Sequence, residues 1–196
     1  MKRKFIYFAI ILISVILFSS NINDYVIILE DEALSAFNYL NKVRKNPSAF
    51  SSEIGVSLSY VKAKDNLLWN EKLAKAAADK AADMAQRDYF AHVDPDGCGM
   101  NYHISQAGYE LPEKWIFPKS NNYFESIYYE YGYAEAGEGI RAIKSLINDR
   151  GTNPPGHRNH LLGIEDFWVD CKDCGIGIAS NGNEVYVSVL IAKHDF

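Results

Sequence analysis

Hydrophobic residues first recur at helical spacing after residue 30. Every third position from Leu34 to Leu40 is hydrophobic, which places these side chains on one face of a helix that we predict over residues 31–45. Pro47 ends this helix, because the residue before a proline resists the helical conformation. The same proline favours a short second helix immediately afterwards, with Asn46 as its cap.

An alanine-rich segment predicts a long helix that begins after Asn70, a good N-terminal cap, and ends near Asp88. Leu73, Ala77 and Met84 lie on one face of this helix. Because several side chains on that face are small, we expect another element to pack closely against it. Further helices are predicted over residues 101–107, 134–148 and 157–162.

The pattern changes to strands towards the C-terminus. Gly175 to Ala179 predicts one strand, Asn181-Gly182 is a tight hairpin signal, and residues 184–192 predict a second strand. Both faces of this second strand are largely apolar, so we expect it to be covered on both sides. Helices followed by an antiparallel hairpin favour an α+β fold with helices on the faces of a small sheet.

The first twenty residues differ from the rest of the chain. Three basic residues precede an apolar run over residues 5–18, and Ser19 and Ser20 follow. This is the layout of a secretory signal peptide, and the run is shorter than the roughly 20 residues that span a bilayer. An uncleaved N-terminal anchor is the alternative. Either interpretation predicts a secreted or extracytoplasmic protein, with a single domain over residues 21–196.

Composition and charge narrow the classes of partner. The chain has 196 residues, of which 48% are hydrophobic and 23% are charged, as in an ordinary packed domain. Removing Lys2, Arg3 and Lys4 with the signal changes the formal charge from −5 to −8. Such an acidic domain is not expected to bind nucleic acid or anionic membrane surfaces. The oligomeric state is left open.

Three cysteines allow at most one intramolecular disulfide. Cys171 and Cys174 have the C-x-x-C spacing, but no second C-x-x-C is present to complete a structural zinc site. We expect either a small loop disulfide or two free thiols here. Cys98 is then the unpaired thiol.

The candidate chemistry lies in loops and at helix ends. His92 lies in FAHVDPDG and His157 in NPPGHRNHLLG. Glu125 is an acid among aromatic residues, where burial without a partner is costly. Asp149 ends a predicted helix, where a carboxylate is unfavourable because the C-terminus is already electronegative. A cation or a histidine near Asp149 would explain its position.

The remaining polar residues have simpler interpretations. Asp94 and Asp96 are typical turn residues beside a proline and a glycine, and Arg158 is expected to pair with an acid. Three further histidines are expected to be solvated or to make a single hydrogen bond: His103, His160 and His194. Sequence motifs of common hydrolases, nucleotide-binding proteins and zinc proteases are absent. Spacing alone brings none of the four candidate residues together.

Six stretches occur in a diagnostic order. They read ALSAFNYLNKVRKNP, LLWNEKLAKAAADKAADMA, FAHVDPDG, PPGHRNHLLG, GIGIA and VYVSVLIA. In this order the sequence resembles the bacterial branch of the CAP superfamily, the cysteine-rich secretory, antigen five and pathogenesis-related proteins, whose domain is also called the SCP domain. The resemblance extends from about Asp31 to Lys193. The eukaryotic disulfide pattern of the family is not reproduced by three cysteines.

The resemblance implies a three-layer α-β-α sandwich with a small central antiparallel sheet. It also implies a cleft in which His92, Glu125, Asp149 and His157 meet. The family's G-E-N triplet is Phe124-Glu125-Ser126 here, and a glutamate is common in the family where this chain has Asp149. Two imidazoles and carboxylate oxygens suit a divalent metal, zinc first.

The resemblance implies a binding protein more readily than an enzyme. We therefore expect a secreted module whose cleft holds a divalent metal and an extracellular ligand, such as a lipid or another apolar molecule. A metal-dependent, protease-like hydrolase that uses the same cleft is the alternative. A further alternative is an extracellular interaction module in which the four residues are purely structural.

Overall fold

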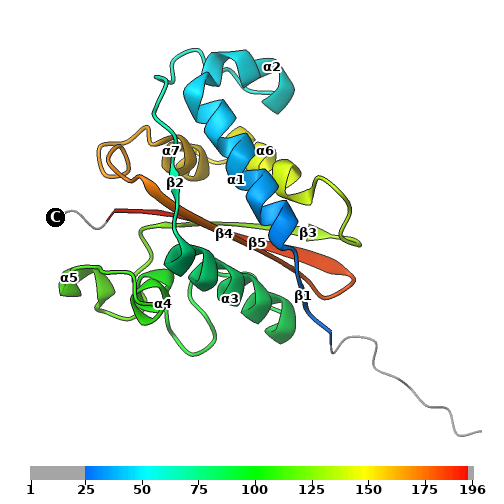
Figure 1. Ribbon diagram of the computed structural model, residues 1–196, viewed down its shortest axis with the longest axis vertical. Helices are drawn as coiled ribbons and strands as arrows, with labels where there is room; N and C mark the ends of the chain where they lie inside the picture. The colour runs from blue at the N-terminus through cyan, green and yellow to red at the C-terminus, as the bar shows by residue number, and fades with distance from the viewer. Residues whose placement is uncertain (1–24, 194–196) are drawn as a thin grey trace, which may run out of the picture.

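The computed structural model describes residues 25–193 of the chain. The strands in this part of the chain form one sheet (Figure 1). Four strands lie in the order β1-β4-β5-β3 and pair antiparallel, while the short β2 pairs parallel with β4. The strand bounds are β1 Ile27–Ile28, β2 Leu68–Trp69, β3 Glu125–Tyr131, β4 Asp173–Ser180 and β5 Glu184–Ala192.

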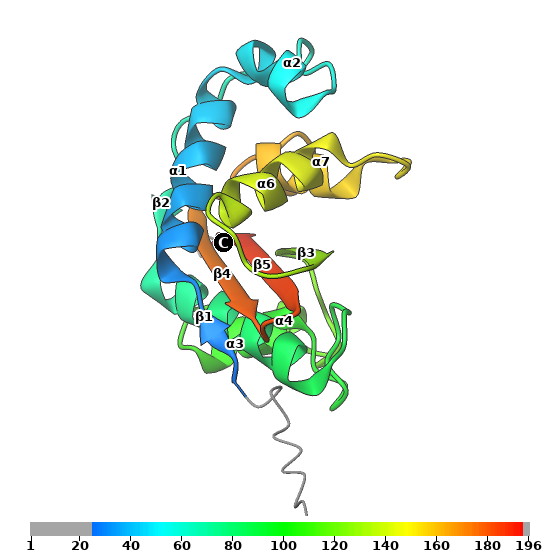
Figure 2. The same ribbon diagram turned by 90° about the vertical axis from the view of Figure 1, so that its right-hand side faces the viewer.

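Helices cover both faces of this sheet. Figure 2 shows α1, α6 and α7 on one side and α3 and α4 on the other. The arrangement confirms the predicted α+β fold, a three-layer α-β-α sandwich with a small, mainly antiparallel sheet. The helix bounds are α1 Glu30–Lys45, the 3-10 helix η2 Pro47–Phe50, α2 Ser51–Ile54, α3 Glu71–Arg87, α4 Met100–Gln106, α5 Glu113–Ile116, α6 Glu138–Asn148 and α7 Gly156–Leu162.

Small residues let α3 lie directly on β4. A Cβ atom on Gly175 would stand 2.1 Å from the backbone nitrogen of Ala74, and one on Gly177 would stand 2.2 Å from the carbonyl carbon of Ala77. Both distances are far below van der Waals contact. The predicted close packing of the alanine-rich helix is therefore confirmed, and β4 supplies the matching glycines.

The predicted face of α1 is only partly correct. Leu40 and Val43 are fully buried, but Leu34 is 45% exposed. Ala36 is buried instead, because α6 approaches α1 closely beside it. A Cβ on Gly139, in the first turn of α6, would lie 2.1 Å from the carbonyl oxygen of Glu32. The helix contact therefore selects small residues rather than leucine.

The two predicted caps have different outcomes. The side chain of Asn70 accepts hydrogen bonds from the backbone N–H groups of Lys72 and Leu73, at 3.1 and 3.2 Å, which confirms it as the cap of α3. Asn46 makes no side-chain cap bond to η2, so that prediction was wrong. Pro47 nevertheless lies at the start of η2, as expected.

The three cysteines are free thiols in the structure. Cys171 and Cys174 are fully buried. Burial raises the pKa of the Cys171 thiol to about 11 and that of Cys174 to about 12. Thiols of this kind are poor nucleophiles, so the C-x-x-C pair is a core feature here.

The predicted signal peptide or anchor over residues 1–20 lies outside the described residues. Within residues 25–193, no helix combines the length and apolar character that crossing a membrane requires. His194 also lies outside the described part of the chain.

Candidate functional site

Glu125 binds His92 at the start of β3. The Glu125 side chain is fully buried, and its Oε2 lies 2.9 Å from Nδ1 of His92. Its other oxygen, Oε1, accepts a hydrogen bond of 2.8 Å from the hydroxyl of Ser188. Ser188 comes from β5, which pairs with β3. The buried acid therefore has the hydrogen-bond partners that its burial requires. Its bond to His92 also holds the loop that carries this histidine.

Asp149 binds His157 across the junction between α6 and α7. Asp149 is the C-terminal cap of α6 in a left-handed conformation, with φ 48°, which aspartate tolerates better than most residues. Its Oδ1 lies 2.9 Å from Nδ1 of His157, and its Oδ2 accepts the backbone N–H of the same residue at 3.0 Å. The expectation that a histidine lies near this helix-end acid is confirmed.

The carboxyl of Asp149 is held in its charged form. Burial raises its pKa, but the hydrogen bond from His157 and the charge of that ring hold the pKa below its ordinary value. The neighbouring Arg158 was expected to pair with an acid, but its guanidinium forms no ion pair within the described part of the chain. Its guanidinium donates to the carbonyl oxygens of Ile147, at 2.7 Å, and Asn148. It therefore satisfies the last carbonyls of α6.

His160 is a buried structural residue rather than a solvated one. Its side chain joins β3 and β5, because Nδ1 lies 2.8 Å from the hydroxyl of Ser126 and Nε2 lies 3.4 Å from the carbonyl oxygen of Ile191. Burial is the main reason that the pKa of His160 is lowered to about 3; the hydrogen bond to Ile191 opposes the shift, and smaller effects of His157, Arg44 and His92 act in the same direction as burial. The ring is therefore neutral at ordinary pH, and both candidate histidines lie within electrostatic range of it.

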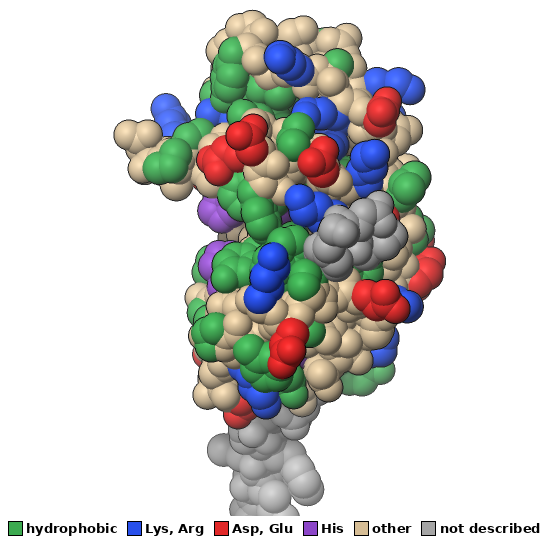
Figure 3. Space-filling model, turned by 90° about the vertical axis from the view of Figure 1, so that its left-hand side faces the viewer, with side chains coloured by type: hydrophobic (Ala, Val, Ile, Leu, Met, Phe, Trp, Pro, Cys, Tyr) green, Lys and Arg blue, Asp and Glu red, His purple; other side chains and the backbone are tan. Residues whose placement is uncertain are grey.

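The four predicted residues thus form two carboxylate–imidazole pairs. In each pair the carboxylate takes Nδ1 of the ring, and Nε2 has no hydrogen-bond partner among the described residues. The side chains of His92 and His157 are 41% and 34% exposed. Figure 3 shows histidine side chains along a recess at one edge of the molecule, below an overhanging upper part.

The two pairs do not close into a compact four-residue cluster. Among the residues that the structure describes, no three of the four bring ligand atoms within 4.8 Å of one another. The group that meets this limit is a different one, formed by Asp94, Cys98 and His103. As expected, Asp94 is a turn residue and His103 makes a single hydrogen bond, but no sequence pattern indicated that these side chains meet Cys98.

Even so, the pairs suit a metal in one respect. Metal-binding histidines usually donate the N–H of one ring nitrogen to a carboxylate, which fixes the tautomer and leaves the other nitrogen as ligand. Both rings have this arrangement. All four carboxylate oxygens already accept hydrogen bonds. The acids therefore orient the rings, and the Nε2 atoms are the ring nitrogens left available to a metal.

Comparison with known proteins supports the family assignment. Residues 37–191 match the model of the cysteine-rich secretory protein family, CAP. No curated protein sequence matched the chain.

Two solved structures share the fold. An outer surface protein from Borrelia burgdorferi has a TM-score of 0.53 at 13% identity, covering 87% of this chain and 98% of its own. An extracellular protein containing a SCP domain from Bacillus anthracis has a TM-score of 0.51 at 15% identity, and the match covers 84% of this chain. The match spans only 41% of the Bacillus protein. At these identities the structures establish the fold alone.

Proposed function

This chain belongs to the cysteine-rich secretory protein (CAP) family, and from that premise we propose that it is an extracellular binding module. In this proposal His92 and His157 hold a divalent cation, with zinc as the preferred ion, beside a recess that accepts a ligand. One observation carries the proposal: each ring has Nδ1 fixed by a buried carboxylate, at 2.9 Å in both pairs, and Nε2 without a hydrogen-bond partner in residues 25–193. Similarity to outer-surface and extracellular proteins supports the location.

Zinc suits this set of donors because imidazole nitrogen is among its preferred ligands. Two protein ligands leave further positions for water or for an oxygen or nitrogen of a bound molecule. The ion would supply Lewis acidity to whatever occupies those positions. Glu125 and Asp149 would keep the two rings in the tautomer that can bind a metal.

The same contacts favour binding over hydrolysis. A general base must be within hydrogen-bond reach of the proton that it removes. In this arrangement Glu125 is held by His92 and Ser188, and Asp149 by His157 and the backbone. Use of either carboxylate as a base would compete with the hydrogen bond that orients its histidine. We therefore propose a binding role for the recess.

An apolar groove elsewhere supports an apolar ligand. A cavity of about 510 Å³ lies between α1, α3 and β4, and it is not lined by the four cleft residues. Its walls include Leu34, Trp69 and Ile176, and Glu71 and Lys75 also line it. Apolar walls with charged groups beside them suit a molecule that has an apolar chain and a polar head. Leu34, exposed against expectation, is part of this surface.

We expect Leu34→Lys to weaken binding of an apolar fluorescent probe by about tenfold, because a charge would then face the apolar walls. The measurement is probe fluorescence during titration with the protein. Lys62→Leu, a change outside the groove, is the control. Equal probe binding by wild type and Leu34→Lys would exclude this groove as the apolar site.

A zinc titration monitored by calorimetry tests the metal site. It is best done on the Cys98→Ser protein, so that the Asp94, Cys98 and His103 group does not contribute. We expect one ion per chain near neutral pH and no measurable binding after His157→Ala. Binding should weaken below about pH 6, where free imidazole takes up a proton.

Asp149→Asn gives the sharper test. Asparagine fits the left-handed cap position and its oxygen can still accept the backbone N–H of His157. Its NH₂ group would then face Nδ1 and force the proton onto Nε2, the proposed ligand atom. We expect zinc affinity to fall by about 10- to 100-fold, while Asp79→Asn, in an exposed ion pair, should leave it unchanged. Unchanged affinity in both His157→Ala and Asp149→Asn would mean that the two pairs are purely structural.

A further inference from the structure

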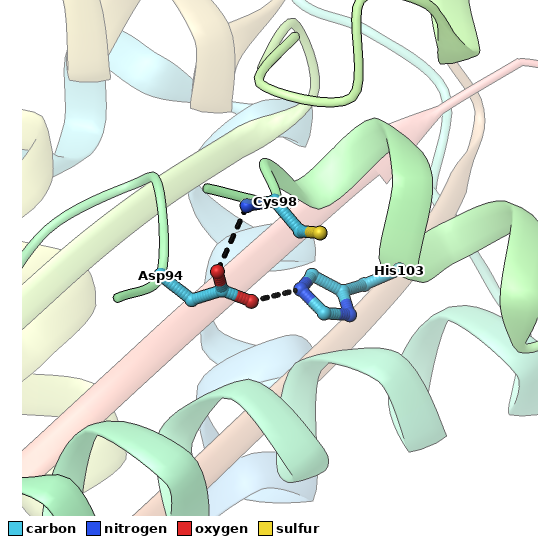
Figure 4. Close-up of side chains that lie close together, drawn as sticks. All are labelled: Asp94, Cys98 and His103. Carbon is cyan, nitrogen blue, oxygen red and sulfur yellow. Dashed lines mark hydrogen bonds and ion pairs between the residues drawn. The ribbon is translucent and has the colours of Figure 1, made fainter. Parts of the chain in front are cut away.

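A second group of metal-binding side chains lies beside α4, apart from the paired histidines. Asp94 and Cys98 come from the loop after α3, and His103 comes from α4 itself. One ligand atom from each residue lies within 4.8 Å of the others. Figure 4 shows the carboxylate of Asp94 pointing at the imidazole of His103, with the thiol of Cys98 beside them. We propose that these three residues bind a divalent cation of the zinc class.

The backbone fixes the acid and the thiol on one closed turn. Oδ1 of Asp94 accepts the N–H groups of Asp96, at 2.9 Å, and Cys98, at 2.8 Å. The N–H of Asp94 in turn donates to the carbonyl oxygen of Cys98 at 2.9 Å. Oδ1 is therefore used by the turn, and Oδ2 remains to face a ligand.

The carboxyl of Asp94 is charged and already paired with the histidine. Burial raises its pKa, but the hydrogen bonds from the Cys98 N–H and from His103 hold the pKa below its ordinary value. Oδ2 lies 2.7 Å from Nε2 of His103. An ion bound between these two atoms would displace the proton that now joins them, which would move to Nδ1 of a neutral ring or to solvent from a protonated ring.

The start of α4 is held firmly against this turn. The N–H of Gly99 donates to the carbonyl oxygen of Lys119 at 2.7 Å. A Cβ on Gly99 would lie 2.3 Å from the carbonyl oxygen of Asn121. The segment between Cys98 and His103 is therefore held in contact with residues 119–121. Cys98 and His103 are thus positioned before any ion binds.

The donor set selects the class of cation. Thiolate, imidazole and carboxylate together suit zinc, whereas magnesium and calcium require oxygen ligands. Zinc–ligand bonds of about 2.0–2.3 Å place tetrahedral ligand atoms roughly 3.5 Å apart. Side-chain shifts of about an ångström would bring the three atoms to that spacing. Binding would release the thiol proton and leave a fourth position for water.

The group is accessible from solvent. A cavity of about 390 Å³ is lined by Asp94 and His103. The cations on its wall are engaged elsewhere. Lys75 and Arg87 form ion pairs with Asp79 and Asp96, and the amine of Lys80 donates to the carbonyl oxygen of Ala91 at 2.8 Å.

Cadmium tests the proposal directly, because a cadmium–thiolate bond absorbs in the ultraviolet. In the reduced full chain we expect a charge-transfer band that saturates with the absorbance of one cadmium–thiolate bond per chain. Cys98→Ser should abolish the band, and Asp94→Asn, whose amide oxygen can still accept both turn N–H groups, should weaken the affinity by about tenfold or more. His157→Ala should leave the band unchanged, which separates this site from the proposed cleft.

A band that persists in Cys98→Ser would place the metal on Cys171 or Cys174 and overturn the proposal. So would a band that does not saturate, or one that is lost in His157→Ala. Alkylation gives an independent measurement on the wild type. Because Cys171 and Cys174 are fully buried, Cys98 is the reactive thiol, and Zn²⁺ in excess over both proposed sites should slow its alkylation by about tenfold or more. An unchanged rate would contradict the proposal without any variant.

Discussion

Replacing Gly177 with alanine is expected to destabilise the protein severely. The new methyl group would lie 2.2 Å from the carbonyl carbon of Ala77 and 2.3 Å from its oxygen. These are backbone atoms of α3, so the helix must move away from the sheet. Overpacking of this kind costs about 3 kcal/mol, which lowers the melting temperature of a domain of this size by roughly 10 °C. Thermal unfolding followed by circular dichroism measures the change.

Gly156→Ala is the matched control. Nothing lies within 4 Å of a Cβ at Gly156, and its φ is not in the left-handed range. It also lies within α7, where alanine is the better helix former. We expect this variant to melt at or slightly above the wild-type temperature. If Gly177→Ala melts within about 2 °C of wild type, then α3 and β4 are not packed as closely as the structure shows.

The close contact of α3 and β4 was half visible in the sequence. Alanines on one face of the helix indicated a close neighbour, and GIGIA was recognisable as a strand. Nothing in local pattern identified the two segments as partners, because about a hundred residues separate them along the chain. The steric need for Gly175 and Gly177 appears only when the helix lies on the strand.

The strand β3 was not predicted at all. Its sequence, ESIYYEY, contains isoleucine and three tyrosines, which favour strands, but the segment was considered only as an acid among aromatic residues. The register of β3 is what positions Glu125. It is opposite Leu190 on β5, and Ser188 on the same strand donates to it. Missing the strand therefore meant missing the second partner of the buried acid.

The candidate cleft residues were found by resemblance, and their pairing was found by structure. The position of Asp149 at a helix end indicated a nearby cation or histidine, and His157 is that partner. The sequence could not show that each acid binds a single histidine through Nδ1. That detail depends on side-chain direction, and it changes the proposed role of the acids from ligands to positioning groups.

The prediction for the environment of His160 was the least accurate of those made from the sequence. This residue lies three residues after His157 in GHRNH, yet its side chain is buried whereas that of His157 is 34% exposed. Neutral imidazole has one donor and one acceptor nitrogen. Nε2–H donates to Ile191, and Nδ1 accepts from Ser126. Both nitrogens are therefore satisfied without a charge, which explains why the ring can be 2% exposed.

This burial predicts a loss of stability in mild acid. The pKa of His160 is about 3 in the folded protein, mainly because of burial, and about 6.5 in an unfolded chain. Between these values the unfolded chain binds a proton that the folded chain excludes, so stability falls as the pH falls. The slope from one such group is about 1.4 kcal/mol per pH unit. We expect about 2 kcal/mol to be lost from this residue between neutral pH and about pH 5.

Urea unfolding at about pH 7.5 and about pH 5, in the presence of a chelator, measures this contribution. His160→Gln can place an amide donor and acceptor near the same partners without titrating, so its stability should depend on pH less than that of wild type, by about 2 kcal/mol over this range. Ser126→Ala removes a hydrogen bond but keeps the ring, so it should lose stability at both pH values and retain the wild-type dependence.

Staying above about pH 5 limits the contribution of carboxylates whose pKa is lowered by folding, such as Asp149 and Asp94, because those groups take up protons mainly in stronger acid. Identical pH dependence in wild type and His160→Gln would show that His160 titrates equally in the folded and unfolded chains. A neutral, buried imidazole joining β3 and β5 would then be the wrong description of the GHRNH segment.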